Sequence, residues 1–321
     1  MKVFKSINEY SNKEKSYLTI GTFDGVHIGH QQIIKNLVKE AHSKNNLAVV
    51  LTFFPHPRNV INNKKSLKLI DSLSEKEKKL KALGVDVLII HPFSRSFSEL
   101  SADDYIKLVL IEKLKISKIF VGYDHRFGKN RTASVSDLIL YGKKYKFDVS
   151  IIEAKEINKT SVSSTKIRIA LSKGNINLAN QFLGSDYQIE GKVIRDQGLG
   201  SKIGFPTANI KLNKINKVLP MNGVYWVYTL LEEKLFFGML NYGKRPTLKS
   251  RKLTIEVHFF SLSENLYNRY IKIYFKEKIR NEKKFDSLNS LKNQLEIDKK
   301  TCLDLEKLHK KEIIKTIFVK N

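Results

Sequence analysis

The first half of the chain alternates short apolar runs with stretches in which apolar residues recur at helical spacing. The apolar runs predict buried strands over residues 17–20, 47–54, 87–90, 116–121 and 149–152. The periodic stretches predict a helix after residue 30 and helices over about 74–83, 101–114 and 134–145. Because strands alternate with helices, we expect a parallel, doubly wound α/β sheet with ligands at the carboxyl ends of its strands.

From residue 187 the pattern changes to strands separated by turns. Runs rich in Val, Ile, Tyr and Phe predict strands over residues 187–194, 207–212, 223–231, 234–240, 253–260 and 270–276. Six antiparallel strands of this length predict a small closed β-barrel, and apolar spacing over about 287–314 predicts a C-terminal helix packed on it. Because the pattern changes after a short predicted helix at 175–183, we predict one domain over residues 1–185 and a second over residues 186–321.

The composition is that of a globular protein of 321 residues, of which 41% are hydrophobic. A single cysteine, Cys302, excludes an intramolecular disulfide and a Cys-rich metal site. No run approaches the roughly 18 apolar residues of a membrane helix, and residues 1–9 lack the apolar core of a secretory signal. We therefore expect a cytoplasmic protein without a membrane partner. We also expect a monomer or a weak homo-oligomer.

The formal net charge of +26 makes nucleic-acid binding one hypothesis for this chain. The lysines, however, are spread through every predicted element and form no single stripe. We therefore expect no nucleic-acid partner, although part of the positive field can attract phosphorylated substrates.

The segment from Gly21 to His30 joins the first predicted strand to the first predicted helix and contains three glycines. Glycines let the backbone approach a bulky anion, and the helix start offers free N–H groups at the positive end of its dipole. His27 and His30 lie three residues apart, so on a helical turn they project to the same side. This arrangement suits nucleotide phosphates, whereas the alternative is a glycine-rich turn with two surface histidines.

The pattern Gly-x-Phe-Asp-Gly-x-His-x-Gly-His resembles the signature of adenylyl- and cytidylyltransferases. In this longer form it is similar to the FAD synthetase module of bacterial bifunctional riboflavin kinase/FAD synthetases. The resemblance implies a Rossmann-like nucleotidyltransferase domain. It also implies that His27 and His30 are catalytic and that the ATP-binding residues include Gly21, Phe23, Asp24 and Gly25.

Two further motifs at predicted strand ends resemble this family. Residues 55–57 read Pro-His-Pro, and residues 122–128 keep Gly122, Asp124, Phe127 and Gly128 of a Gly-x-Asp/Asn-Phe-x-Phe-Gly motif. The resemblance implies that His56 and Asp124 belong to a flavin or nucleotide pocket. The chain departs from the family at Phe54, where an acid is usual, and at His125, where phenylalanine is usual.

Residues 161–171 contain a serine-rich helix start followed by an arginine, which by itself indicates an ordinary N-cap with a surface arginine. The segment also resembles the nucleotidyltransferase motif Ser-Ser-Thr-x-Ile-Arg. The resemblance implies that Ser164, Thr165 and Arg168 bind the β- and γ-phosphates of ATP.

In the second half, residues 204–210 read Gly-Phe-Pro-Thr-Ala-Asn-Ile. Thr207 and Asn209 alternate along a predicted strand and share one face, where their oxygens suit Mg²⁺. The loop before them, with Gly200 and Lys202, is flexible enough to close over phosphates. Alone, the run would be a turn and an edge strand.

The whole run resembles the riboflavin kinase signature, with further ordered matches at Pro220 and at residues 223–225, 241–247, 255–258, 266–267, 279–280 and 284–286. The resemblance implies that Glu256 is the catalytic base that takes the proton from the riboflavin 5′-hydroxyl, and that Asn241 lines the pocket. The chain departs from the family at Asp196 and Asn268, where glycine is usual.

These motifs predict a bifunctional enzyme of flavin cofactor biosynthesis. The C-terminal domain would phosphorylate riboflavin to FMN with ATP and Mg²⁺, and the N-terminal domain would transfer AMP from ATP to FMN, giving FAD and pyrophosphate. One alternative is a riboflavin kinase whose first domain is weak or uses another nucleotidyl acceptor. A second alternative is a basic RNA-binding protein that reuses the same two folds.

Overall fold

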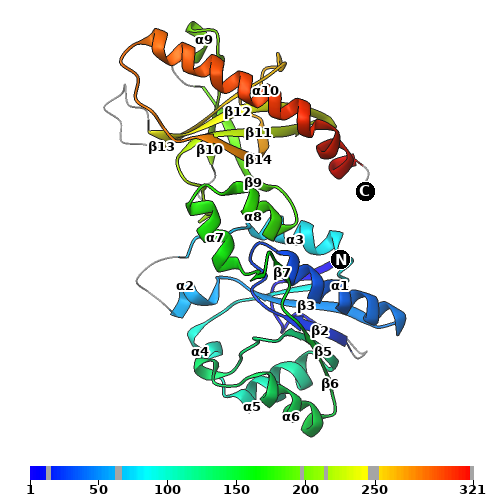
Figure 1. The fold of residues 1–321 in the computed structure, drawn as a ribbon. Coiled ribbons are helices and arrows are strands. Elements are labelled where there is room, and N and C mark those ends of the chain that lie inside the picture. Colours follow the sequence, from blue (N-terminus) through cyan, green and yellow to red (C-terminus); the bar gives the residue numbers. More distant parts are fainter. Residues whose placement is uncertain (12–15, 62–66, 196–198, 213–215, 245–252, 319–321) are drawn as a thin grey trace. The chain divides into compact units, whose positions relative to one another are not determined.

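The computed structural model describes residues 1–11, 16–61, 67–195, 199–212, 216–244 and 253–318. The chain forms two compact units, shown in Figure 1. The first unit comprises residues 1–165 with 216–218, and the second comprises residues 166–215 with 219–321. These units are defined by packing and not by activity. The division into an activity in residues 1–185 and another in residues 186–321 therefore stays a prediction.

The first unit contains a six-stranded parallel sheet in the order β1-β4-β3-β2-β5-β6. Its strands are β1 Lys2–Phe4, β2 Ser16–Ile20, β3 Leu47–Phe53, β4 Val87–His91, β5 Ile116–Gly122 and β6 Asp148–Ile152. The five predicted strands are all present, and the predicted doubly wound sheet is confirmed. β1 was not predicted, because three residues at a sheet edge carry too little pattern.

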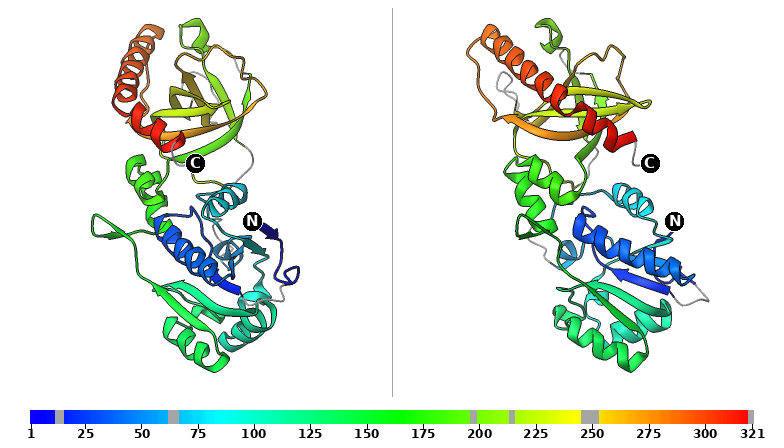
Figure 2. Two further views of the ribbon diagram at one scale, coloured as in Figure 1. Left: turned by 90° about the vertical axis from the view of Figure 1, so that its right-hand side faces the viewer. Right: turned by 45° about the vertical axis from the view of Figure 1, so that its right-hand side comes forward.

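Helices cover both faces of this sheet. They are α1 Ile28–Ser43, α2 Pro57–Ile61, α3 Leu73–Ala82, α4 Arg95–Ser98, α5 Ala102–Asp104, the π-helix η1 Tyr105–Lys113, the short 3₁₀ helix η2 Lys129–Arg131, and α6 Val135–Tyr145. α1 and α3 lie on one face, and α4 to α6 lie on the other (Figure 1, Figure 2). Along β5, Phe120 packs in the core under α1 and α3, whereas Ile119 and Val121 pack in the opposite core.

A short hairpin, β7 Glu156–Ile157 with β8 Thr160–Ser161, leads to the helices α7 Ser164–Ser172 and α8 Ile176–Leu183. α8 belongs to the second unit and packs on the strands that follow it. Its Asn180 side chain donates a hydrogen bond to the carbonyl of Phe275 at 2.9 Å and accepts one from the Tyr187 N–H at 2.8 Å. α8 is therefore part of the scaffold of the second unit.

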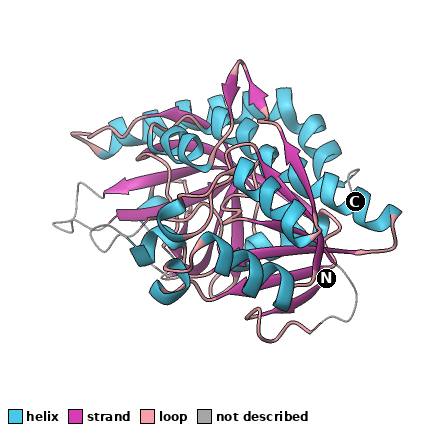
Figure 3. Cartoon of the chain, turned by 90° about the horizontal axis from the view of Figure 1, so that it is seen from below, coloured by secondary structure: helices cyan, strands magenta, loops and turns pink. Residues whose placement is uncertain are grey.

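The second unit contains a closed antiparallel barrel in the order β10-β13-β12-β11-β14-β9, and β9 also pairs with β10. The strands are β9 Tyr187–Ile194, β10 Ala208–Leu212, β11 Gly223–Leu231, β12 Lys234–Lys244, β13 Leu253–Phe259 and β14 Tyr270–Arg280. Figure 3 draws these strands in magenta and the helices in cyan. The predicted six-stranded barrel is confirmed, and β12 and β14 continue past the predicted Leu240 and Lys276.

The C-terminal helix α10, Leu288–Phe318, packs on the outside of the barrel as predicted. The contact is apolar and includes the barrel residues Trp226 and Phe237 and the fully buried Cys302 of α10. Arg280 at the end of β14 holds the helix by donating to both carboxylate oxygens of Asp298, at 2.7 to 3.0 Å. Because Asp298 is buried, breaking this pair would leave an uncompensated charge.

None of the helices in the described ranges has the length and apolar character needed to cross a membrane.

Candidate active sites

The turn between β2 and α1 has an unusual backbone. Phe23, Gly25 and Val26 have φ values of 44°, 88° and 40°, in the left-handed region that favours glycine. Two non-glycine residues in this region within four positions indicate strain that the surrounding structure must compensate. The turn leads directly to His27, which is the N-cap residue of α1.

The predicted pairing of the two histidines is confirmed. The rings of His27 and His30 stack with their centroids 3.5 Å apart, and Phe23 contacts His30 edge-on at 5.1 Å. The N–H of His30 donates to Nδ1 of His27 at 3.3 Å, so the neutral His27 ring carries its proton on Nε2. Nδ1 of His30 is enclosed and has no hydrogen-bond partner among the described residues.

Burial keeps both imidazoles neutral near pH 7. It lowers the pKa of His27 to about 4 and the pKa of His30 well below its ordinary value, with the neighbouring His27 and Lys76 adding to the second shift. The pair is therefore a set of neutral hydrogen-bond donors at the positive end of α1, where free backbone N–H groups also point outward. Such a set can stabilise a phosphate as its charge grows.

Asp24 connects the turn to two other segments. Its carboxylate is buried and accepts hydrogen bonds from the N–H groups of Ile70 and Asp71 at 3.0 to 3.2 Å. Its carbonyl accepts a hydrogen bond from the hydroxyl of Ser164 at 2.8 Å. The fold thus brings the predicted phosphate motif at the start of α7 against the turn, with Thr165 next along the helix.

Other predicted site residues belong to the same sheet edge. β3 and β5 flank β2, so the segments after them, with His56 and Asp124, follow the carboxyl ends of neighbouring strands. A methyl group added at Gly122 would lie 3.2 Å from Oδ1 of Asp124, so this carboxylate folds back over the end of β5. Nδ1 of His56 accepts from the N–H of Arg58 at 3.1 Å. Arg168 lies one helical turn beyond Ser164 on α7.

The prediction from sequence missed two lysines beneath the turn. Lys76 of α3 is buried and donates to the carbonyl of Thr22 at 2.7 Å. Lys79 donates to the carbonyl of Gly25 at 3.2 Å and to both oxygens of Asp71 at 2.9 Å. The only signal was a lysine-rich helix over 74–83, in which nothing distinguished inward from outward lysines.

The predicted kinase residues form a row across three strands. Asn209 on β10 lies directly opposite Glu256 on β13, which lies directly opposite Asn241 on β12. Directly opposed residues in antiparallel strands project to the same side of the sheet. Their chain neighbours Leu240 and Val257 are fully buried on the other side, so the row lies on the outer face of the barrel.

Two residues beside this row were not predicted as site residues. The hydroxyl of Thr254 donates to Oε1 of Glu256 at 3.2 Å. His258, two residues beyond Glu256, donates from Nδ1 to the carbonyl of Pro206 at 2.8 Å and so holds the segment before Thr207. Burial lowers the pKa of His258, which keeps this donor neutral. Residues at i±2 on a strand share a face, and this spacing could have indicated both.

Gly200 lies in α9, Leu199–Lys202, against the same segment. Its carbonyl accepts from the N–H of Phe205 at 2.8 Å. A methyl group added at Gly200 would overlap the carbonyl oxygen of Phe205 and lie 3.3 Å from the hydroxyl oxygen of Thr207. Residues 199–202, predicted as part of a flexible loop, therefore form a short helix, and Gly200 packs against the segment that leads to the predicted metal ligand Thr207. The side chain of Lys202 and the residue Asp196 lie outside the described part of the chain.

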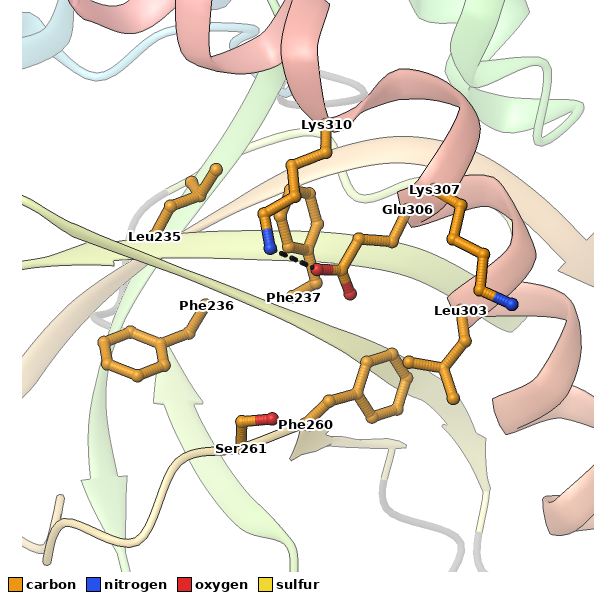
Figure 4. A pocket seen from close by; sticks show the side chains of 9 residues that line it. All are labelled: Leu235, Phe236, Phe237, Phe260, Ser261, Leu303, Glu306, Lys307 and Lys310. Carbon is orange, nitrogen blue, oxygen red and sulfur yellow. Dashed lines mark hydrogen bonds and ion pairs between the residues drawn. The ribbon is translucent and has the colours of Figure 1, made fainter.

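A cavity of about 380 Å³ lies elsewhere on the second unit, between α10 and the part of the barrel formed by the start of β12 and the residues just after β13 (Figure 4). Its walls include three phenylalanines and two leucines, and its charged groups include Lys310 and Glu306, which form an ion pair at 2.9 Å. Among the predicted site residues whose side chains the structure describes, none lines this cavity.

The fold and these two groups of residues define a class of protein, a transferase that joins a nucleotidyltransferase-type α/β unit to a kinase-type β-barrel. Comparisons with known proteins agree with it. A family model described as FAD synthetase matches residues 9–166, and one described as riboflavin kinase matches residues 183–305.

Curated relatives match nearly the whole chain. The bifunctional riboflavin kinase/FMN adenylyltransferase of Buchnera aphidicola subsp. Schizaphis graminum is 40% identical over 306 residues, which cover 93% of this chain and 96% of that protein. The protein of the same name from Escherichia coli K12 is 36% identical over 305 residues, which cover 94% and 97%. The chain belongs to the family of bifunctional riboflavin kinases/FMN adenylyltransferases.

A crystal structure of a macrolide-efflux protein from Streptococcus pneumoniae has a TM-score of 0.84 and 29% identity, and covers 94% of this chain and 97% of that one. The same fold therefore extends over almost the whole chain. Family membership confirms the predicted function. The chain has riboflavin kinase and FMN adenylyltransferase activities, which use riboflavin, FMN and ATP.

Proposed function

We propose that each activity of the chain resides in one of the two groups of residues described above. AMP transfer from ATP to FMN takes place at the turn Gly21–His30, and phosphate transfer from ATP to riboflavin takes place at the row of Asn209, Glu256 and Asn241. The observation that carries this assignment is the alignment of that row across β10, β13 and β12, because it groups a carboxylate with amide side chains on one face.

In the adenylyltransferase site, the FMN phosphate attacks the α-phosphorus of ATP and pyrophosphate leaves. The free N–H groups of α1, together with His27 and His30, donate hydrogen bonds to the oxygens on which charge grows. Because the His27 ring is neutral near pH 7 and carries its proton on Nε2, it can donate a hydrogen bond from Nε2–H without first being protonated. Ser164, Thr165 and Arg168 then hold the β- and γ-phosphates that become pyrophosphate.

In the kinase site, Glu256 takes the proton of the riboflavin 5′-hydroxyl as that oxygen attacks the γ-phosphorus of ATP. The hydroxyl of Thr254 holds one carboxylate oxygen, which orients the other toward the substrate. Asn241, exposed at the end of the row, is placed to contact the flavin. Gly200 and Lys202, both in the short helix α9, contribute to ATP binding.

The kinase site also suits Mg²⁺. Thr207 and Asn209 present a hydroxyl and an amide oxygen, which are hard donors that fit this ion, and Mg²⁺ commonly takes only one or two protein ligands beside nucleotide phosphates. When bound, the ion neutralises charge on the ATP phosphates. We further propose that the protein acts in the cytoplasm as a monomer or weak homo-oligomer, without nucleic acid.

Two variants of the full chain test the assignment. Glu256→Gln keeps the shape of the side chain but cannot accept a proton, so FMN formation from riboflavin should fall about 100-fold or more. His30→Ala removes one preorganised donor, so FAD formation from supplied FMN should fall about 100-fold. Each variant should keep the other activity, which serves as its internal control.

Products are measured by separating riboflavin, FMN and FAD over time, with pyrophosphate assayed in parallel. Pyrophosphate should appear one for one with FAD. Normal FMN formation by Glu256→Gln would remove this carboxylate from the kinase mechanism. Normal FAD formation by His30→Ala would indicate that the two histidines only shape the turn, and that the site of adenylyl transfer lies elsewhere.

A further inference from the structure

Three residues from the segment matched by the riboflavin kinase model are part of the first unit. Residues 216–218 lie between β10 and β11 in sequence, but they pack within residues 1–165. The N–H of Leu69 donates to the carbonyl of Asn216 at 2.6 Å, and the N–H of Val218 donates to the carbonyl of Leu69 at 2.8 Å. The side-chain amide of Asn216 also donates to the carbonyl of Leu67 at 2.9 Å. The first unit is therefore incomplete without these residues.

The central residue of this segment, Lys217, forms a buried ion pair. Its ammonium group lies 2.5 Å from Oε2 of Glu75, and the two side chains are 8% and 6% exposed. Burial opposes ionisation of Glu75, but Lys217 and the Ser72 N–H hold its pKa below the ordinary value. The charge of Lys217 therefore compensates a carboxylate that would otherwise be costly to bury.

Glu75 in turn fixes the start of α3. It accepts from the N–H of Ser72 at 2.6 Å, and the Ser72 hydroxyl accepts from the N–H of Glu75, which completes a capping box. One residue later on α3, Lys76 donates to the carbonyl of Thr22, and one turn later Lys79 donates to the carbonyl of Gly25. A shift at the start of α3 therefore displaces both ammonium groups that hold the turn.

A second route leads from the same segment to the turn. Leu69 forms hydrogen bonds with residues 216–218 through both its N–H and its carbonyl group. The next two residues in the chain are Ile70 and Asp71. The N–H groups of these two residues bind the carboxylate of Asp24, in the middle of the turn. Because the turn holds residues with positive φ, its conformation depends on such external hydrogen bonds.

We propose that residues 216–218 are a positioning element of the FMN adenylyltransferase site, in which Lys217 acts through Glu75 and α3 on the turn Gly21–His30. The inference rests on the proposed assignment of ATP to this turn. It means that a residue in the kinase part of the sequence supports the other activity.

The test uses the full chain with Lys217→Met, which keeps much of the side-chain volume and removes the charge. We expect FAD formation from supplied FMN to fall between about 10- and 100-fold, because a displacement of about 1 Å at a reacting centre has this effect. The KM for ATP in this reaction should rise. FMN formation from riboflavin by the same protein should stay within about twofold.

Three further variants separate positioning from mere stability. Lys217→Arg keeps the charge and should restore most FAD formation, whereas the matched control Lys234→Met, at an exposed lysine of the same sequence segment, should change neither activity. In a Glu75→Gln background, Lys217→Met should have a much smaller effect, because the two residues act through each other. Rates are measured well below the melting temperature of each variant, so that loss of folded protein does not contribute.

Normal kcat and KM for FAD formation in folded Lys217→Met would overturn the inference. The inference would also be overturned if Lys217→Met lowered FAD formation equally in the Glu75→Gln and wild-type backgrounds, since Lys217 would then not act through Glu75. His30→Ala is the reference for the site itself. If His30→Ala abolishes FAD formation and Lys217→Met does not, only the positioning role fails, whereas normal FAD formation by His30→Ala means that the proposed site is wrong.

Discussion

Acidification tests whether the fold holds His27 neutral. Its pKa is about 4 in the folded protein, against an ordinary value of 6.5. As the pH falls, the unfolded chain takes up this proton first, so His27 contributes stability that is complete above its unfolded pKa and is lost as the pH falls toward its folded pKa. Between about pH 7 and about pH 5 the loss from this one ring is about 2 kcal/mol.

The comparison variant is His27→Asn, which cannot titrate and still provides a good N-cap acceptor for α1. Hydrogen exchange in peptides that cover β2 and α1 gives the free energy of opening for this unit alone. Other groups also titrate in this range, so the quantity of interest is the difference between wild type and variant at each pH. That difference should change by about 2 kcal/mol in the direction of lower wild-type stability at acid pH.

Parallel curves for the two proteins would refute the reasoning, because they would show that His27 has the same pKa in the folded and unfolded states. A bound triphosphate should reduce the difference, since an anion beside the ring favours its protonated form. ATP without FMN is the probe for this second measurement, and an unchanged difference with saturating ATP would argue against phosphate contact by His27.

Two other predictions concern the second unit. Gly200→Ala should lower FMN formation about tenfold while FAD formation from FMN is retained, because the new methyl group would overlap the carbonyl of Phe205 beside Thr207. Ser201→Ala is the control, and equal rates of FMN formation for the two variants would refute this prediction. A fragment of residues 166–321 should melt at a higher temperature than one of residues 187–321, which lacks α8 and its buried Ile176, Phe182 and Leu183. Burial of each of these three side chains contributes about 1.5 to 3 kcal/mol, and equal melting temperatures for the two fragments would contradict this prediction.

Most of the fold followed from the sequence because burial and strand or helix preference agreed. β9 and β11 have the predicted bounds, since dense Val, Ile, Tyr and Phe are bounded by turns. The segment 105–113 was predicted as helix, but its π-helical form was not, because spaced apolar residues mark a buried face without fixing the hydrogen-bond step. The short β1 and the β7–β8 hairpin carry too few residues to form a pattern.

The candidate sites were predictable where spacing alone determines direction. The separation of His27 and His30 by three residues placed both rings on one side, and the structure stacks them. The lysines that hold the turn were not predictable. In a chain with 58 Lys and Arg residues, Lys76 and Lys79 resemble any solvent-exposed pair, and only the folded packing of α3 shows that both bind backbone carbonyls of the turn.

The role of Lys217 could not be predicted from the sequence, because its partner Glu75 lies 142 positions away and no local pattern links the two residues. Removing one partner of a buried ion pair typically costs about 3 to 5 kcal/mol, since the remaining charge stays buried without compensation. Any single cut of the chain between residues 166 and 216 therefore leaves Glu75 without Lys217, wherever the boundary between the two activities lies. The kinase sequence is thus needed twice, once for its own barrel and once for three residues that complete the unit in which we place adenylyl transfer.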